Sequence, residues 1–150
     1  KKITTRFVKN DHLYVIGKSV LNPIALEAAL KIKEVSYIHA EGFPSGELKH
    51  GPIALIEKGT PCLVLINNDE FEADVLSSAQ ELKARGAYLI GVSPNKKDPL
   101  FDSWIQIPET GEATSFGHLV ATQILAYYSA LLRGHDPDKP RNLAKSVTVK

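Results

Sequence analysis

The sequence predicts an α/β domain of three layers, with a mostly parallel sheet between helices. Three short apolar runs, at residues 13–16, 62–66 and 88–92, are typical of strands that are buried on both faces. Helical patterns separate these runs, and another helical pattern follows the last of them. Such an alternation of strands and helices favours a parallel sheet, with right-handed crossovers that place helices on both of its faces.

The first helix is predicted from Ile24 to Tyr37. Asn22 is a favourable N-cap residue, and Pro23 suits the first helical position because its missing N–H would have no partner there. Wide apolar coverage predicts that most of this helix is buried. The preceding loop, Gly17-Lys18-Ser19, lacks the first glycine of a phosphate-binding P-loop, so we interpret it as a tight turn near a ligand. Ligands in this fold class bind at the carboxyl ends of the strands, where this loop lies.

Residues 39–51 are predicted to form mainly turns, because three glycines and one proline interrupt this stretch. Residues 52–56 are compatible with one short helix. A second long helix is predicted over residues 70–85, since acids in its first turn and bases in its last turn complement the helix dipole. Gly86 then supplies a C-cap.

The carboxyl-terminal third adds a strand, a helix and a tail. Residues 104–108 fit a short fourth strand, and residues 114–133 a long apolar helix that Gly134 closes. Residues 136–150 contain two prolines and no clear period before position 146. We expect this tail to be an ordered, extended segment laid over a single domain of residues 1–150.

Composition excludes several functions. The chain has 150 residues, enough for one core without a disulfide or metal, and its net charge of +1 argues against nucleic-acid or membrane-surface partners. No apolar run approaches the roughly 18 residues of a membrane span, and no signal peptide opens the chain. The lone Cys62 excludes an internal disulfide and is interpreted as an inert core residue. Because the chain begins at Lys1 and contains no methionine, we expect a fragment of a longer protein.

Three polar positions have two interpretations each. Lys31 and Glu34 share a helix face with Glu27, which indicates either a solvated ladder of ion pairs or a half-buried carboxylate that shuttles protons. His50, between glycines, is either a surface residue in a turn or part of a loop fixed near a ligand. Lys145 is either an ordinary exposed lysine or, packed beside Arg141, a neutral amine able to attack a carbonyl. The remaining histidines show no metal-ligand spacing, so no metal is expected.

Three segments in this order resemble the carboxyl-terminal isomerase domain of the glutamine–fructose-6-phosphate aminotransferases, also called glucosamine-6-phosphate synthases. They are Ala-Leu-Lys-Ile-Lys-Glu-Val-Ser-Tyr-Ile-His-Ala-Glu at 29–41, Gly-Glu-Leu-Lys-His-Gly-Pro at 46–52 and Pro-Arg-Asn-Leu-Ala-Lys-Ser-Val-Thr-Val at 140–149. The resemblance covers residues 13–149. It implies the second of two sugar isomerase (SIS) domains, with a flavodoxin-like five-stranded sheet.

The resemblance also implies catalytic roles in turning fructose 6-phosphate into glucosamine 6-phosphate. Lys145 matches the lysine that forms a Schiff base with the C2 carbonyl, and Glu34 the carboxylate that moves a proton between C1 and C2. Lys31 matches the lysine that helps transfer the hydroxyl proton. His50 matches the histidine of ring opening, which the family donates across a dimer interface. Ala144 joins Lys145 and Glu34 in binding substrate, and Ala144 and Val147 line the path of ammonia.

The resemblance further implies partners. A first SIS domain and a glutaminase domain are expected outside this chain, in a cytoplasmic homodimer that needs no cofactor. Residues 42–45 depart from the family pattern, and no cradle of Ser and Thr for a phosphate is evident, so we expect the isolated chain to be inactive. The alternatives are a related SIS isomerase or deaminase, and a non-catalytic module that binds sugar phosphates. Retention of Lys31, Glu34, His50 and Lys145 together disfavours the module.

Overall fold

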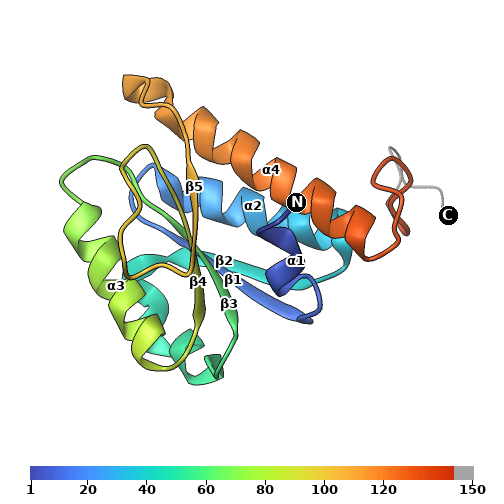
Figure 1. Cartoon of the computed structure of the whole chain (residues 1–150), viewed down its shortest axis with the longest axis horizontal. Helices are drawn as coiled ribbons and strands as arrows, with labels where there is room; N and C mark the ends of the chain where they lie inside the picture. Colours follow the sequence, from blue (N-terminus) through green and yellow to red (C-terminus); the bar gives the residue numbers. More distant parts are fainter. Residues whose placement is uncertain (144–150) are drawn as a thin grey trace, which may run out of the picture.

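A computed structural model describes residues 1–143 and contains one sheet of five strands (Figure 1). The spatial order is β2-β1-β3-β4-β5, and every neighbouring pair is parallel. The strands are β1 (His12–Gly17), β2 (His39–Pro44), β3 (Pro61–Leu65), β4 (Tyr88–Ser93) and β5 (Ser103–Gln106). The predicted three-layer α/β fold with five strands is confirmed.

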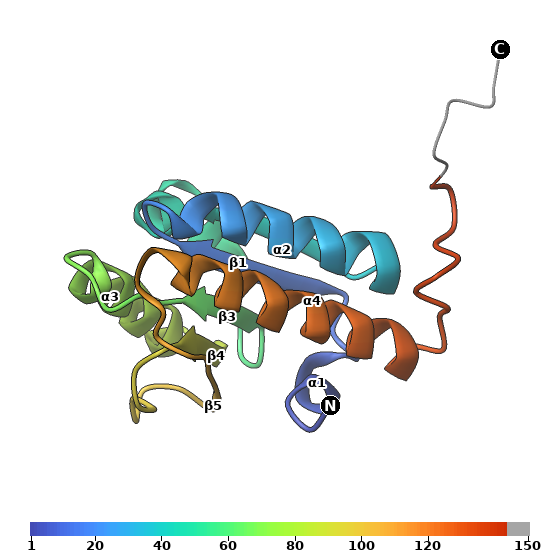
Figure 2. The same ribbon diagram turned by 90° about the horizontal axis from the view of Figure 1, so that it is seen from above.

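Two long helices cover one face of the sheet and one covers the other (Figure 2). α2 and α4 lie side by side over the first face, and α3 lies on the second. No helix within residues 1–143 is long and apolar enough to cross a membrane. The helices are α1 (Thr4–Phe7), α2 (Leu21–Ser36), α3 (Glu72–Ala84) and α4 (Thr114–Leu132), with 3-10 helices η1 (Ser45–His50), η2 (Pro52–Leu55) and η3 (Gly111–Ala113).

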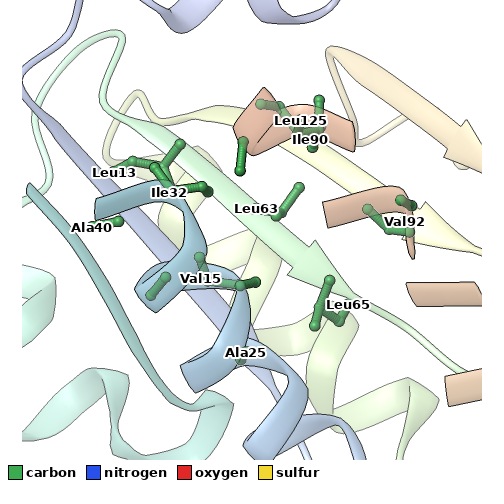
Figure 3. Close-up of a cluster of buried hydrophobic side chains, with 14 of the residues drawn as sticks. Leu13, Val15, Ala25, Ile32, Ala40, Leu63, Leu65, Ile90, Val92 and Leu125 are labelled. Carbon is green, nitrogen blue, oxygen red and sulfur yellow. The ribbon is translucent and has the colours of Figure 1, made fainter. Parts of the chain in front are cut away.

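Each face of the sheet has its own apolar core, because successive side chains of a strand point to opposite faces. In β3, Leu63 and Leu65 enter the cluster beneath α2 and α4, which Figure 3 shows with Ile32 and Leu125. Cys62 belongs to the cluster beneath α3. It is fully buried, and burial raises the pKa of its thiol to about 12, which supports its interpretation as an inert core residue.

The prediction of turns at residues 39–51 is wrong for the first six, which form the edge strand β2. This strand pairs with β1 alone and ends at Pro44, which fits a sheet edge because proline has no N–H to donate. Gly42 allows α2 to lie against β2. A Cβ atom at Gly42 would come within 2.5 Å of the backbone oxygen of Ala25. The glycine that suggested a turn therefore serves a close approach of helix and strand.

The predicted N-cap at Asn22 is also wrong, since α2 begins at Leu21 and Val20 occupies the N-cap, two residues before Asn22. The loop turns tightly through Ser19, whose φ is +54°, and its carbonyls accept the first N–H groups of the helix. Leu21 donates to Lys18 at 3.0 Å, and Asn22 donates to Ser19 at the same distance. Asn22 already lies within the first turn, where its side-chain oxygen is buried and accepts no hydrogen bond from the described part of the chain.

Candidate active site

Lys31 and Glu34 form a close acid–base pair on α2. Lys31 Nζ donates a hydrogen bond of 2.6 Å to Glu34 Oε2 and lies 3.7 Å from Glu27 Oε1. The side chains of Lys31 and Glu34 are only 33% and 25% exposed. The hydrogen bond to Glu34 raises the pKa of Lys31, so the ammonium form faces the carboxylate at neutral pH. Because both side chains are half-buried, the pair differs from a fully solvated ladder of ion pairs. One hydrogen bond connects the Lys31 ammonium, a proton donor, to the Glu34 carboxylate, a proton acceptor.

The pair lies away from the loops at the carboxyl ends of the strands. α2 leaves the carboxyl end of β1 and returns to the start of β2 at His39, so Glu34, in its last turn, is near the amino ends of the strands. At the carboxyl ends, Lys18 forms an ion pair with Asp74 and lies 5.1 Å from the centre of the Phe71 ring. In the loop of residues 17–19, for which a nearby ligand is predicted, the Lys18 ammonium is therefore paired with a carboxylate of the same chain.

His50 lies on the other side of the sheet from Glu34. It ends η1, whose Leu48 is fully buried in the core beneath α3, whereas α2 packs into the opposite core. η1 is held to α3 by a hydrogen bond of 3.2 Å from Ser78 Oγ to the carbonyl of Ser45, and by an ion pair of Lys49. The structure therefore does not bring His50 and Glu34 together within one chain.

The described part of the tail is attached to the end of α2. The backbone N–H of Arg141 donates a hydrogen bond of 2.8 Å to the hydroxyl of Tyr37, and the Arg141 guanidinium lies 4.0 Å from the centre of the Tyr37 ring. His135 packs edge-on against the same ring at 4.6 Å. Tyr37 is the residue that caps α2, three positions after Glu34. The predicted site residues Ala144, Lys145 and Val147 lie outside the described residues, so their contacts stay predictions.

The environment of His118 is not evident from the sequence. This α4 residue is fully buried, and its Nε2 atom lies 3.0 Å from Asn67 Oδ1 at the carboxyl end of β3. Its Nδ1 atom has no hydrogen-bond partner among residues 1–143. Burial lowers the pKa of His118 to about 4, so the ring is neutral at pH 7. No motif at its position signals this contact, because Asn67 is distant in the sequence. Among residues 1–143, no three His, Cys, Asp or Glu side chains are grouped to hold a metal ion.

α4 presents an apolar stripe to solvent. Its members recur every three or four positions, which places them on one face of the helix, and each is 45–67% exposed. Beside the stripe, a groove of about 730 Å³ runs between α4 and the edge strand β5. An exposed apolar stripe of this size is typical of surfaces that take part in protein–protein contacts. The stripe consists of Phe116, Val120, Ile124, Tyr127 and Leu131.

The fold and a family match define the class of protein. Residues 6–133 match the SIS domain family, and the chain belongs to that family. The particular relatives are glutamine–fructose-6-phosphate aminotransferases (isomerizing). The chain is 46% identical to the one from Sulfurisphaera tokodaii over 99% of its own length, and 49% identical to the one from Thermococcus kodakarensis over 94%. It spans about a quarter of the length of these relatives, at 25% and 24%.

Solved structures agree with this assignment. The carboxyl-terminal domain of glucosamine-fructose-6-phosphate aminotransferase from Francisella tularensis matches 92% of the chain with a TM-score of 0.82 and 36% identity, and 40% of that domain is covered. A glucosamine-6-phosphate deaminase from Thermotoga maritima matches 97% of the chain with a TM-score of 0.76 and 30% identity, and 44% of it is covered. The predicted resemblance to the carboxyl-terminal SIS domain of the aminotransferases is confirmed.

Proposed function

We propose that this chain is the carboxyl-terminal half of the isomerase part of an enzyme that makes glucosamine 6-phosphate from fructose 6-phosphate and ammonia derived from glutamine. The names of its relatives support this proposal. The observation that carries it is the Lys31–Glu34 pair, hydrogen-bonded at 2.6 Å on the helix to which the lysine-bearing tail is attached. An aldose–ketose shift needs a carboxylate between two carbons and a group that activates the carbonyl.

The proposed chemistry begins at Lys145. Its neutral amine attacks the C2 carbonyl of open-chain fructose 6-phosphate, and loss of water gives a Schiff base. Ammonia then attacks C2 and releases the Lys145 amine, which leaves an imine of the sugar. The Glu34 carboxylate takes a proton from C1 and returns it to C2. The C1 hydroxyl loses its proton and the imine nitrogen gains one, which leaves an aldehyde at C1 and an amine at C2. Lys31 is one hydrogen bond away and assists that hydroxyl transfer.

The rest of the site is proposed to come from other chain segments. The first SIS domain covers the apolar stripe of α4 and holds most of the sugar phosphate, since Lys18 is already paired within this chain. A glutaminase domain supplies ammonia along a path that Ala144 and Val147 line. A second copy contributes His50, because η1 and α2 pack into cores on opposite faces of the sheet. The same proposal makes the protein a cytoplasmic homodimer, with residues 136–150 as an ordered tail.

Trapping the Schiff base tests the proposal. The longer protein with both SIS domains is incubated with fructose 6-phosphate, reduced with borohydride, digested and analysed by mass spectrometry. We expect a sugar-phosphate adduct on Lys145 and none in Lys145→Ala, which should keep its melting temperature. A lower melting temperature in Lys145→Ala would indicate a structural lysine instead.

The alternatives make different predictions in this assay. Tight binding of the sugar phosphate without any adduct would favour a non-catalytic module. The deaminase alternative rests on the Thermotoga maritima structure. An enzyme of that kind would convert glucosamine 6-phosphate to fructose 6-phosphate and free ammonia without glutamine, whereas the proposed enzyme needs glutamine for full turnover.

A further inference from the structure

Tyr37 is the point at which the carboxyl-terminal tail attaches to α2. Its hydroxyl accepts the backbone N–H of Arg141 at 2.8 Å, and its ring receives the Arg141 guanidinium at 4.0 Å. We propose that Tyr37 is a positioning residue, which holds Arg141 so that the Lys145 amine stays within reach of a sugar bound at Glu34. This inference rests on the proposed function and adds to it a residue that touches neither the sugar nor the reacting atoms.

The sequence spacing makes Tyr37 suitable for this task. Tyr37 follows Glu34 by three helical positions, or about 4.5 Å along the axis. Lys145 follows Arg141 by four positions, so the chain between their Cα atoms spans at most about 14 Å. Attachment at Arg141 therefore limits the length of chain between Tyr37 and Lys145 to four residues. The described part of the tail passes the end of α2 in Figure 2.

Without the contact to Tyr37, the tail would be tethered at His135, whose N–H bonds to the carbonyl of Ala130 at the end of α4. Ten residues would then separate the tether from Lys145, instead of four. The effective concentration of a tethered group falls as roughly the −3/2 power of tether length, so release lowers that of Lys145 about fourfold. We therefore expect a loss in the rate of Schiff-base formation and none in affinity for the sugar phosphate.

Tyrosine offers two separable contacts here. Tyr37→Phe removes the acceptor of the Arg141 N–H and keeps the ring, whereas Tyr37→Ala removes both contacts and the packing of His135. Arg141→Ala removes the guanidinium from the ring while it leaves Tyr37 in place. Lys139→Ala, at an exposed position of the same tail, is the matched control.

Limited trypsin digestion of the full-length protein reports the attachment itself. Cleavage after Arg141 should rise about threefold in Tyr37→Phe and about tenfold in Tyr37→Ala, because each lost contact exposes the arginine more often. Cleavage after Arg133, which is bound to the carbonyls of Val8 and Asn10, should not change. Unchanged cleavage after Arg141 in Tyr37→Ala would overturn the inference.

Single-turnover formation of the borohydride-trapped adduct reports the positioning. At saturating fructose 6-phosphate, we expect the rate to fall about fourfold in Tyr37→Ala and less in Tyr37→Phe, with the Kd of the sugar unchanged within twofold. Arg141→Ala should lower the rate less than Tyr37→Ala, because its backbone N–H can still bond to Tyr37. The double variant should lose no more than Tyr37→Ala, which already removes both contacts. Lys139→Ala should match the wild type.

Two outcomes separate the inference from the function on which it rests. An adduct that forms at the wild-type rate in Tyr37→Ala, although the tail is cleaved faster, would overturn the positioning role and leave the proposed enzyme intact. Absence of an adduct in the wild-type protein would overturn the proposed function and the positioning role together.

Discussion

Glu34 and His50 lie on opposite faces of the sheet, although both belong to segments that flank the edge strand β2. Glu34 is carried by α2, which packs into the core shared with α4, and His50 ends η1, which packs beneath α3. A sugar bound at Glu34 is therefore separated from the His50 of the same chain by the sheet. This arrangement favours a site that two chains build together.

Mixed dimers test whether two chains share a site. Glu34→Gln and His50→Gln should each inactivate a dimer of identical chains. When the two variants are mixed and allowed to re-associate, each mixed dimer contains one site with both residues intact. Random association should then restore about a quarter of the wild-type turnover, since half of the dimers are mixed and half of their sites are intact.

The measurement is turnover of fructose 6-phosphate against mixing ratio. Activity should pass through a maximum at equal amounts of the two variants. If His50 serves its own chain, the mixture stays as inactive as each variant alone.

Glu34→Gln should abolish isomerisation and leave sugar-phosphate affinity within a few-fold, because an amide cannot take the proton from C1. Glu27→Gln is the matched control, since Glu27 also faces Lys31 but at 3.7 Å rather than 2.6 Å. It should reduce turnover by less than tenfold. Proton exchange at C1, followed by NMR in deuterated water, checks the step directly. Normal exchange in Glu34→Gln would contradict the shuttle role.

The free energy of unfolding should decrease as the pH is lowered, because of His118. Its pKa is lowered to about 4 in the folded chain, whereas an unfolded histidine titrates near 6.5, so the unfolded state binds more protons between these values. The stabilisation is full above pH 6.5 and is lost as the pH falls toward 4. Between pH 7 and pH 5 the free energy of unfolding should decrease by about 2 kcal/mol from this group.

Urea unfolding of the wild type and His118→Gln at the two pH values measures this contribution. In His118→Gln, the decrease in the free energy of unfolding that His118 causes should be absent. His39→Gln, at an exposed position, should show the same decrease as the wild type. Equal pH dependence in the wild type and His118→Gln would show that burial does not lower the pKa of this ring.

Gly42→Ala should destabilise the fold. The added Cβ atom would lie 2.5 Å from the backbone oxygen of Ala25 and 2.9 Å from Leu26 Cα, and backbone atoms of α2 move only with the helix. The expected cost is about 1–3 kcal/mol, typical of overpacking. Gly46→Ala is the control, because no atom lies within 4 Å of its added Cβ. Thermal and urea unfolding should separate the two variants, and equal stabilities would contradict the close approach of α2 to β2.

The apolar stripe of α4 should make the isolated chain associate. Phe116, Val120 and Ile124 are half-exposed or more, and burying them against a second surface is favourable. Sedimentation should show an average mass that rises with concentration, and Val120→Lys/Ile124→Lys should keep the chain monomeric. Ser77→Lys/Gln80→Lys adds the same charge to exposed positions of α3 and should not prevent association. A wild-type chain that stays monomeric at high concentration would contradict this expectation.

Local patterns were enough to predict the buried strands. The runs that became β1, β3 and β4 are apolar throughout, as strands must be when helices cover both faces of a sheet. The same patterns failed at β2, because an edge strand with Gly42 and Pro44 has the composition of a turn. Its pairing depends on β1, and the approach of α2 depends on Ala25, which is 17 residues away from Gly42 in the chain.

The sequence by itself determined the class of fold, the family and the spacing that pairs Lys31 with Glu34, since a helix brings residues three apart together wherever it lies. Only the tertiary structure decided on which face of the sheet each candidate residue lies. It separated His50 from Glu34, buried His118 against Asn67 and joined Arg141 to Tyr37. Each of these relationships depends on how distant segments cross over the sheet, and such crossings arise from packing of the whole domain rather than from any local pattern.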